Sequence, residues 1–150
     1  MTYEELVVET GAEIGIEGFA PDSDGVCVLA SDIGEITVMD CKGPREMVLL
    51  NAAVADVPPD AGPALLEALK ANRGFRDTKG STLSVDPESR RFELTQYAPL
   101  EELDPDRLVA MVEDFATTLV SAREKLEGAN LSEATPDDIG GLGLEGFIRV

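Results

Sequence analysis

The chain has 150 residues, of which 30 are acidic and 12 are basic, so its formal net charge at pH 7 is −18. Such a charge repels the phosphates of nucleic acids and anionic membrane surfaces, and it favours a basic or weakly folded polypeptide as partner. The hydrophobic content of 43% is that of folded proteins. We expect one compact domain, residues 1–128, and an acidic, Gly-rich tail, residues 129–150.

The amino-terminal sequence MTYEE lacks the basic and apolar regions of a secretory signal. No apolar run approaches the ~20 residues that a membrane-spanning helix needs. We therefore expect a cytoplasmic protein. Cys27 and Cys41 are too far apart for a CxxC motif and too few for a disulfide scaffold, so reduced thiols are the simplest interpretation.

The first half of the chain predicts a helix followed by three strands. Thr2 and Glu5 match a capping box that opens a helix, although Gly11 and Gly15 weaken it. The apolar residues of this helix lie mostly on one face: Tyr3, Leu6, Val7 and Ile14. Three apolar runs then predict an antiparallel meander, at residues 26–30, 35–41 and 47–54.

The second half predicts a short helix, a hairpin and a long helix. The short helix contains Leu65, Leu66 and Leu69 and should end through a left-handed residue near Asn72-Arg73-Gly74. Alternating apolar residues predict hairpin strands at 82–86 and 91–97. Asp104 and Pro105 open the last helix, expected over about 105–127 with Gly128 just beyond it. Its apolar stripe should pack against the sheet: Leu108, Val112, Phe115, Leu119, Ala122 and Leu126.

The sequence carries no recognisable catalytic constellation. Histidine is absent, which removes the usual near-neutral base and a common metal ligand. The segment Asp22-Ser23-Asp24-Gly25 does not complete a calcium loop and is better interpreted as a polar turn. No glycine-rich phosphate loop follows a strand. We therefore expect no catalytic residue, no cofactor and no metal site.

From Ile36 to Leu126 the predicted elements follow one another in a characteristic order. A hydrophobic strand, MVLLNAAV, runs into the Leu-rich helix that ends at Ala71-Asn72. A hairpin containing LSVD and FEL follows, and then LDP and the helix with Phe115. In this order the sequence resembles the class I type III secretion chaperones of the Tir-chaperone-like family. The resemblance implies an α+β fold, an antiparallel sheet with helices in the order α-β-β-β-α-β-β-α, and no enzymatic activity.

The resemblance also implies a function and its surfaces. The expected protein is a homodimer that binds a secreted effector segment and holds it unfolded, by strand addition at a sheet edge and by helix docking in apolar grooves. The dimer contact would involve Leu65, Leu66 and Leu69, whose alternative is the monomer core. The candidate effector-binding patch, part of which must be core, contains Leu6, Val7, Ile14, Val26, Val28, Ile36 and Val38.

Other interpretations stay open at this point. A regulatory or adaptor domain of the same fold would bind a folded partner or the secretion ATPase, whereas an enzyme would have to work with carboxylates alone. The tail ends in GFIRV, and such a concentration of apolar residues predicts that Phe147, Ile148 and Val150 dock on the effector surface of the same or a neighbouring subunit. The alternative is a disordered apolar end.

Overall fold

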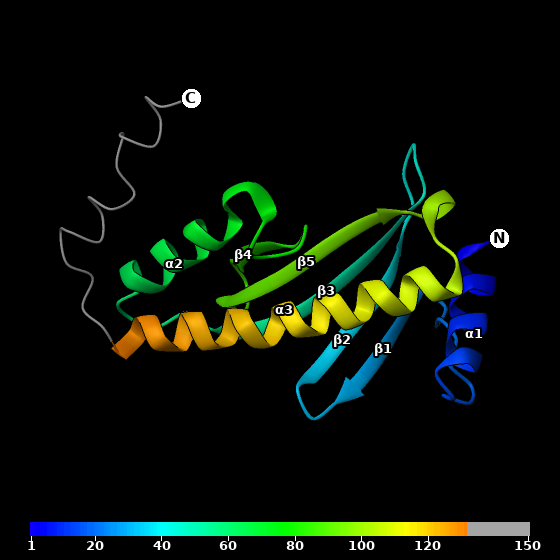
Figure 1. Ribbon diagram of the computed structural model, residues 1–150, viewed down its shortest axis with the longest axis horizontal. Coiled ribbons are helices and arrows are strands. Elements are labelled where there is room, and N and C mark those ends of the chain that lie inside the picture. The colour runs from blue at the N-terminus through cyan, green and yellow to red at the C-terminus, as the bar shows by residue number, and fades with distance from the viewer. Residues whose placement is uncertain (132–150) are drawn as a thin grey trace.

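The computed structural model describes residues 1–131, which contain helices and one antiparallel sheet (Figure 1). The helices are α1 (Tyr3–Glu13), α2 (Gly62–Asn72) and α3 (Pro105–Leu131), with 3-10 turns η1 (Arg73–Phe75) and η2 (Leu100–Glu102). The strands are β1 (Val26–Ser31), β2 (Gly34–Cys41), β3 (Met47–Asp56), β4 (Thr82–Asp86) and β5 (Arg91–Pro99). This element order confirms the predicted α+β fold.

The five strands form one sheet in the order β1-β2-β3-β5-β4. The first three strands form the predicted meander, and β4 and β5 form the predicted hairpin. The hairpin turn is fixed by Asp86, whose carboxylate accepts hydrogen bonds from the N–H groups of Glu88 and Ser89. Because β5 pairs with β3, the two edges of the sheet are β1 and β4.

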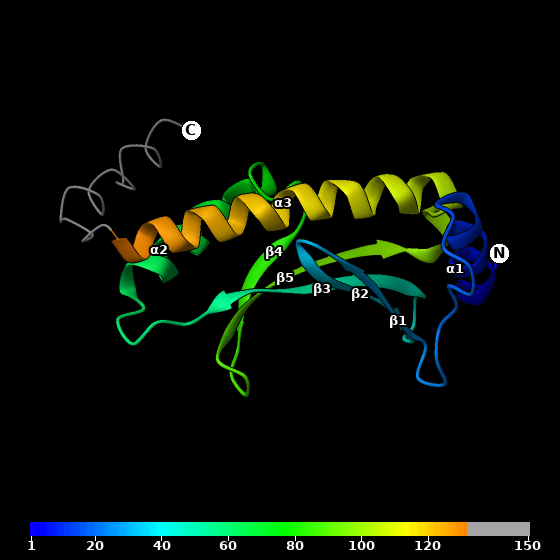
Figure 2. The same cartoon turned by 90° about the horizontal axis from the view of Figure 1, so that it is seen from below.

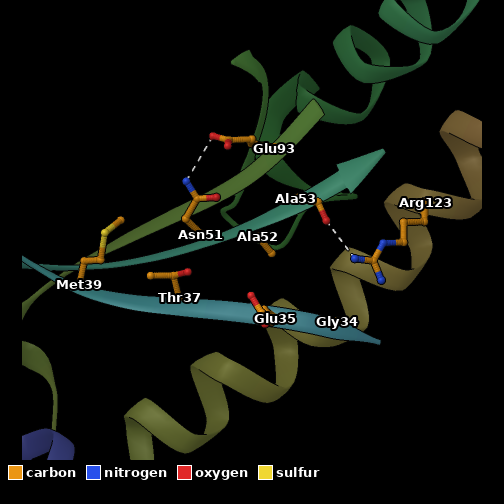
Figure 3. Close-up of a pocket in the computed structure, with 9 residues that line it drawn as sticks. All are labelled: Gly34, Glu35, Thr37, Met39, Asn51, Ala52, Ala53, Glu93 and Arg123. Atoms are coloured by element: carbon orange, nitrogen blue, oxygen red, sulfur yellow. Dashed lines mark hydrogen bonds between the residues drawn. The ribbon is translucent and has the colours of Figure 1, made fainter. Parts of the chain in front are cut away.

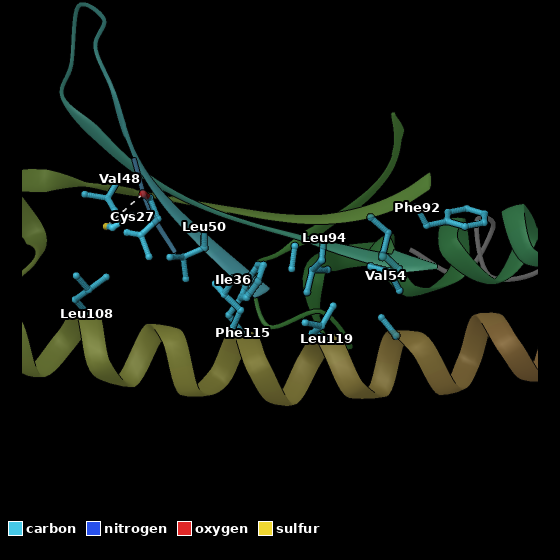
Figure 4. Close-up of a cluster of buried hydrophobic side chains, with 14 of the residues drawn as sticks. Cys27, Ile36, Val48, Leu50, Val54, Phe92, Leu94, Leu108, Phe115 and Leu119 are labelled. Atoms are coloured by element: carbon cyan, nitrogen blue, oxygen red, sulfur yellow. Dashed lines mark hydrogen bonds between the residues drawn. The ribbon is translucent and has the colours of Figure 1, made fainter. Parts of the chain in front are cut away.

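Helix α3 supplies the largest apolar surface that covers the sheet. Figure 4 shows Leu108, Phe115 and Leu119 pointing from α3 toward strand residues that include Leu50 and Leu94, and all five side chains are at most 1% exposed. The helix begins as predicted, because the carboxylate of Asp104 accepts a hydrogen bond from the N–H of Arg107. The predicted packing of this stripe against the sheet is therefore confirmed.

The helices leave one face of the sheet uncovered. Figure 2 shows α3 along one face, with α2 beside it and α1 at the end of the sheet near the N-terminus. No helix of residues 1–131 covers the opposite face, which we call the open face. Its side chains alternate with those of the core and include those of Val26, Val28, Ala30, Glu35, Thr37, Met39, Asn51, Glu93 and Tyr97.

The beginning of α1 and the end of α2 follow local rules that the sequence predicts. Thr2 and Glu5 form the predicted capping box at the start of α1. Beyond α2, Gly74 adopts the predicted left-handed conformation, with φ of 67°. None of the helices in the described part of the chain has the length and apolar character that crossing a bilayer requires.

The predicted end of α3 is wrong, because the helix continues through Gly128 to Leu131. A glycine inside a helix costs about 1 kcal/mol relative to alanine. Beyond it, however, Ala129 is only 6% exposed, and Leu126 one turn earlier is 1% exposed. Packing of this last turn offsets the weak helix propensity of Gly128. The expected domain boundary after residue 128 therefore falls within a helix.

Candidate functional site

The predicted effector-binding patch divides between the core and the surface. Leu6 and Val7 are fully buried, and Ile36 and Val38 are 4% and 1% exposed. These four residues face the interior because α1 lies against the end of the sheet and because alternate residues of β2 point toward the helices. As folded, they are core and offer no surface to a partner, which corrects that part of the prediction.

The other three residues of that patch remain accessible, in two separate places. Ile14, at the end of α1, is 40% exposed. Val28 is 48% exposed and Val26 is half-buried, and both lie on β1 with their side chains on the open face. The structure therefore retains two candidate surfaces, one beside α1 and one on β1.

The surface beside α1 includes residues that the sequence interpretation missed. A cavity of about 530 Å³ is lined by residues that include Val8, Ile16 and Phe19, and Val8 and Ile16 are both more than 40% exposed. Phe19 can close against α1 because position 11 is glycine; a Cβ atom there would lie 2.5 Å from Phe19 Cβ. The available signal was Gly11 itself, which the sequence interpretation took only as a weakness of the helix.

The open face contains a second cavity, shown in Figure 3, with a volume of about 480 Å³. Its charged lining consists of Glu35, Glu93 and Arg123. Arg123 comes from α3 and donates hydrogen bonds to the carbonyl oxygens of Ile33, Ala53 and Val54. The sequence interpretation missed this contact, which fastens α3 to the β1–β2 turn and to the irregular part of β3.

The leucines of α2 lie on the side of the helix that faces away from the core. Leu65 and Leu69 are 41% and 69% exposed, and Leu66 is half-buried. The buried side of α2 is formed by alanines: Ala64, Ala68 and Ala71. The core alternative for Leu65 and Leu69 is therefore wrong, and these two leucines form an exposed apolar pair.

No group of three or more metal-ligating side chains gathers within residues 1–131. Cys27 is buried 3.5 Å from the Tyr3 hydroxyl, and burial raises the pKa of both groups, which keeps the thiol protonated and unreactive. Asp22 accepts hydrogen bonds from the N–H groups of Asp24 and Val26, as expected for the predicted polar turn.

A protein family matches most of this chain. A model of the Tir chaperone protein (CesT) family matches residues 5–124. The chain belongs to this family. CesT-family proteins are chaperones, so the predicted resemblance is confirmed. No curated protein matches the chain.

Solved structures show the same fold. The chain is 22% identical to one in the structure of the HopA1-SchA chaperone-effector complex, with a TM-score of 0.68, covering 81% of this chain and 93% of that one. For the ExsC-ExsE complex the identity is 18%, the TM-score 0.70 and the coverage 82% and 92%. For the Yersinia pestis type III secretion chaperone SycH in complex with a fragment of YscM2, these values are 15%, 0.60, 81% and 99%.

The predicted docking of the tail lies outside the described residues. Phe147, Ile148 and Val150 all follow Leu131, where the description of this CesT-family chain ends. Their docking on the effector surface stays a prediction.

Proposed function

We propose that this CesT-family protein is a cytoplasmic chaperone that binds a segment of a secreted effector and holds it unfolded for type III secretion. Family membership supports this proposal, and so do the similar solved structures, which include a chaperone-effector complex. The observation that carries it for this chain is a free sheet edge at β1.

The hydrogen-bond pattern between β1 and β2 defines that edge. The N–H of Asp40 donates to the carbonyl oxygen of Gly25 over 3.1 Å. In an antiparallel pair, the backbone groups of alternate residues point toward the partner strand. Those of Val26, Val28 and Ala30 therefore point away from β2.

Only part of this edge is available for another strand. Val26 is occupied, because its N–H donates to the Asp22 carboxylate and its carbonyl oxygen accepts from the Asp22 N–H, both over 2.9 Å. Val28 and Ala30 are exposed, and no backbone partner on this edge exists for them within residues 1–131. They offer two N–H and two carbonyl groups to an incoming strand.

The opposite edge of the sheet is already partly paired. The side-chain amide of Asn72, at the end of α2, donates to the Leu83 carbonyl oxygen and accepts from the Leu83 N–H, both over 2.8 Å. This amide acts as a short substitute for a strand beside β4. A client strand is therefore expected at β1.

Binding in extended form explains how such a protein would keep a client exportable. A segment whose backbone groups pair with β1, and whose apolar side chains lie in the cavity beside α1, cannot use those groups for its own fold. The segment loses conformational entropy when it binds the chaperone rather than when it folds by itself. The client then stays free of stable tertiary structure near the chaperone.

The edge prediction is tested by the substitution Val28→Pro. Proline removes one outward N–H and is tolerated at an edge where that N–H faces solvent. Loss of one hydrogen bond of about 1–1.5 kcal/mol should weaken effector binding about tenfold. The measurement has three steps: capture of the effector from the native host by the full chain, identification of its bound segment by limited proteolysis and mass spectrometry, and titration of that purified segment.

The matched control is Val28→Thr, which keeps the N–H and the branched side chain and should bind like the unmodified chain. Circular dichroism establishes that all three proteins are folded. Equal affinity of the proline and threonine variants would contradict strand addition at β1. Capture of a stably folded partner would favour the regulatory or adaptor function instead.

We further propose that the protein is a homodimer through Leu65 and Leu69. An exposed apolar pair on a short helix suits a two-fold, self-complementary contact. Light scattering at micromolar concentration should give twice the chain mass of 16.0 kDa. The double variant Leu65→Asp/Leu69→Asp should give the monomer mass, whereas Val120→Asp, at an exposed position of α3, should remain dimeric. A monomer mass for the unmodified chain would refute the dimer.

A further inference from the structure

The open face is apolar at Val28 of β1 and acidic beside Ala30, where Glu35 of the neighbouring strand β2 lies. Val28 presents an isopropyl group that is 48% exposed. Ala30, two residues along the same face, presents only a methyl group and lies opposite Glu35 of β2. Glu35 is exposed, and no cation pairs with it within residues 1–131. The small Ala30 side chain therefore leaves this carboxylate open toward the free edge.

The open-face cavity beside Glu35 carries an unbalanced negative charge. Glu35 and Glu93 both line it, and Figure 3 shows Glu93 and Asn51 on the side of the sheet away from α3. Glu93 accepts a hydrogen bond from the Asn51 amide over 3.3 Å, which leaves its charge unneutralised. The Arg123 guanidinium donates to three backbone carbonyl groups rather than to either carboxylate. The cavity therefore favours a further cation.

A strand added at β1 would bring its side chains onto this face. Paired residues of adjacent strands share a face, so client residues opposite Val28 and Ala30 would lie above the open face. Strands are about 4.8 Å apart, which places β2 two spacings from the client. The stem of a lysine or arginine opposite Ala30 can lie over the methyl group and carry its charge to Glu35.

We propose that the β1 edge selects client strands that place an apolar residue opposite Val28 and a lysine or arginine opposite Ala30, with Glu35 as the residue that recognises the cation. This inference rests on the proposed function and adds a sequence requirement to it. The client carries the pattern apolar-x-basic, in either chain direction. An acidic residue at the second position would meet Glu35 as a like charge.

Two fluorescein-labelled nine-residue peptides test the requirement. Both have a strand-forming background of threonine, serine and valine, and they differ only in a central Arg-Thr-Phe-Thr-Arg or Glu-Thr-Phe-Thr-Glu, which presents the pattern in both chain directions. Fluorescence anisotropy with the full chain in 0.15 M NaCl should show the arginine peptide binding about tenfold more tightly. The variant Glu35→Lys should abolish or reverse this preference.

The matched control is Glu113→Lys, which changes the net charge equally at an exposed position of α3 and should keep the preference. A preference that Glu35→Lys leaves intact, or that both variants reduce equally, would overturn the assignment to Glu35. Binding of neither peptide would also overturn it. If the unmodified chain bound neither peptide but the Phe147→Asp variant bound both equally, the tail would be the occupant of the edge in the unmodified chain, and the selectivity for a basic client residue would be refuted.

The proposal and the proposed function can fail separately. Suppose that the effector is captured and that Val28→Pro weakens its binding, but that Glu35→Lys leaves the peptide preference unchanged. The chaperone function then stands and the selectivity is refuted. If the peptides show the Glu35-dependent preference but no effector is captured from the host, the selectivity stands and the chaperone function is refuted.

Discussion

Replacing Phe115 by alanine should lower the free energy of unfolding by about 3–5 kcal/mol. The Phe115 side chain is fully buried at the middle of α3, where it meets the inner face of the sheet (Figure 4). Neighbours on both sides, including Leu119 and Leu94, are also fully buried, so the structure cannot collapse readily into the space left by the ring. Urea denaturation followed by circular dichroism at a fixed protein concentration measures the change.

The matched control is Val120→Ala on the same helix. Val120 is 37% exposed, and alanine favours helix more than valine does. Its free energy of unfolding should therefore change by less than about 0.5 kcal/mol. Similar losses for the two variants would contradict the packing of α3 against the sheet through Phe115.

Replacing Arg123 by methionine should destabilise the protein by about 2–3 kcal/mol, because three carbonyl oxygens lose a charged donor. Two of these carbonyl groups belong to Ala53 and Val54, where the pairing of β3 with β5 shifts register. The third belongs to Ile33 in the β1–β2 turn. Methionine keeps much of the side-chain length, so the loss reports mainly on the hydrogen bonds. Amide hydrogen exchange should accelerate at residues 33–36 and 53–55.

Arg107→Met provides the comparison for that variant. The Arg107 guanidinium donates to a single exposed carbonyl oxygen, that of Glu102, and forms an exposed ion pair with the Asp104 carboxylate over 3.6 Å. Its loss should change the free energy of unfolding by less than about 0.5 kcal/mol. Equal effects of the two substitutions, or exchange that accelerates uniformly along the chain, would contradict a specific role for Arg123 at the β3 irregularity.

Most of the elements were predictable because each has its own local signal. Asp104 followed by Pro105 identifies the start of α3, and Thr2 with Glu5 identifies the start of α1. The strands were found from apolar runs and turns. The end of α3 was not predictable, because the local rule that glycine ends helices competes with the burial of Ala129, which depends on distant parts of the chain.

The candidate site was harder to predict than the fold. Apolar periodicity shows that Val38 and Val28 belong to strands, but it does not show which face of β2 or β1 the helices cover. The same limit applies to α2, where alanines rather than leucines form the buried side. Arg123 did carry a signal, since it stands four residues after Leu119, next to the apolar stripe of α3. Its partners are backbone carbonyl groups, which no sequence pattern marks.

The roles of the free edge and of Glu35 depend on sheet order. Val28 and Ala30 become an edge only because β5 inserts beside β3 and leaves β1 outermost. The contact of Asn72 with Leu83 likewise joins a helix to a strand across a connecting loop, and nothing in the sequence marks Leu83 as its partner. A sequence without its strand order therefore predicts that a strand can be added, but not where.

The central claim is that this CesT-family protein holds its client segment unfolded, and amide hydrogen exchange of that segment in the purified complex tests it most directly. The account predicts protection of the few client residues that pair with Val28 and Ala30 or dock beside α1, and exchange at unfolded-chain rates between them. Protection throughout the client segment, as in an independently folded domain, would contradict the account.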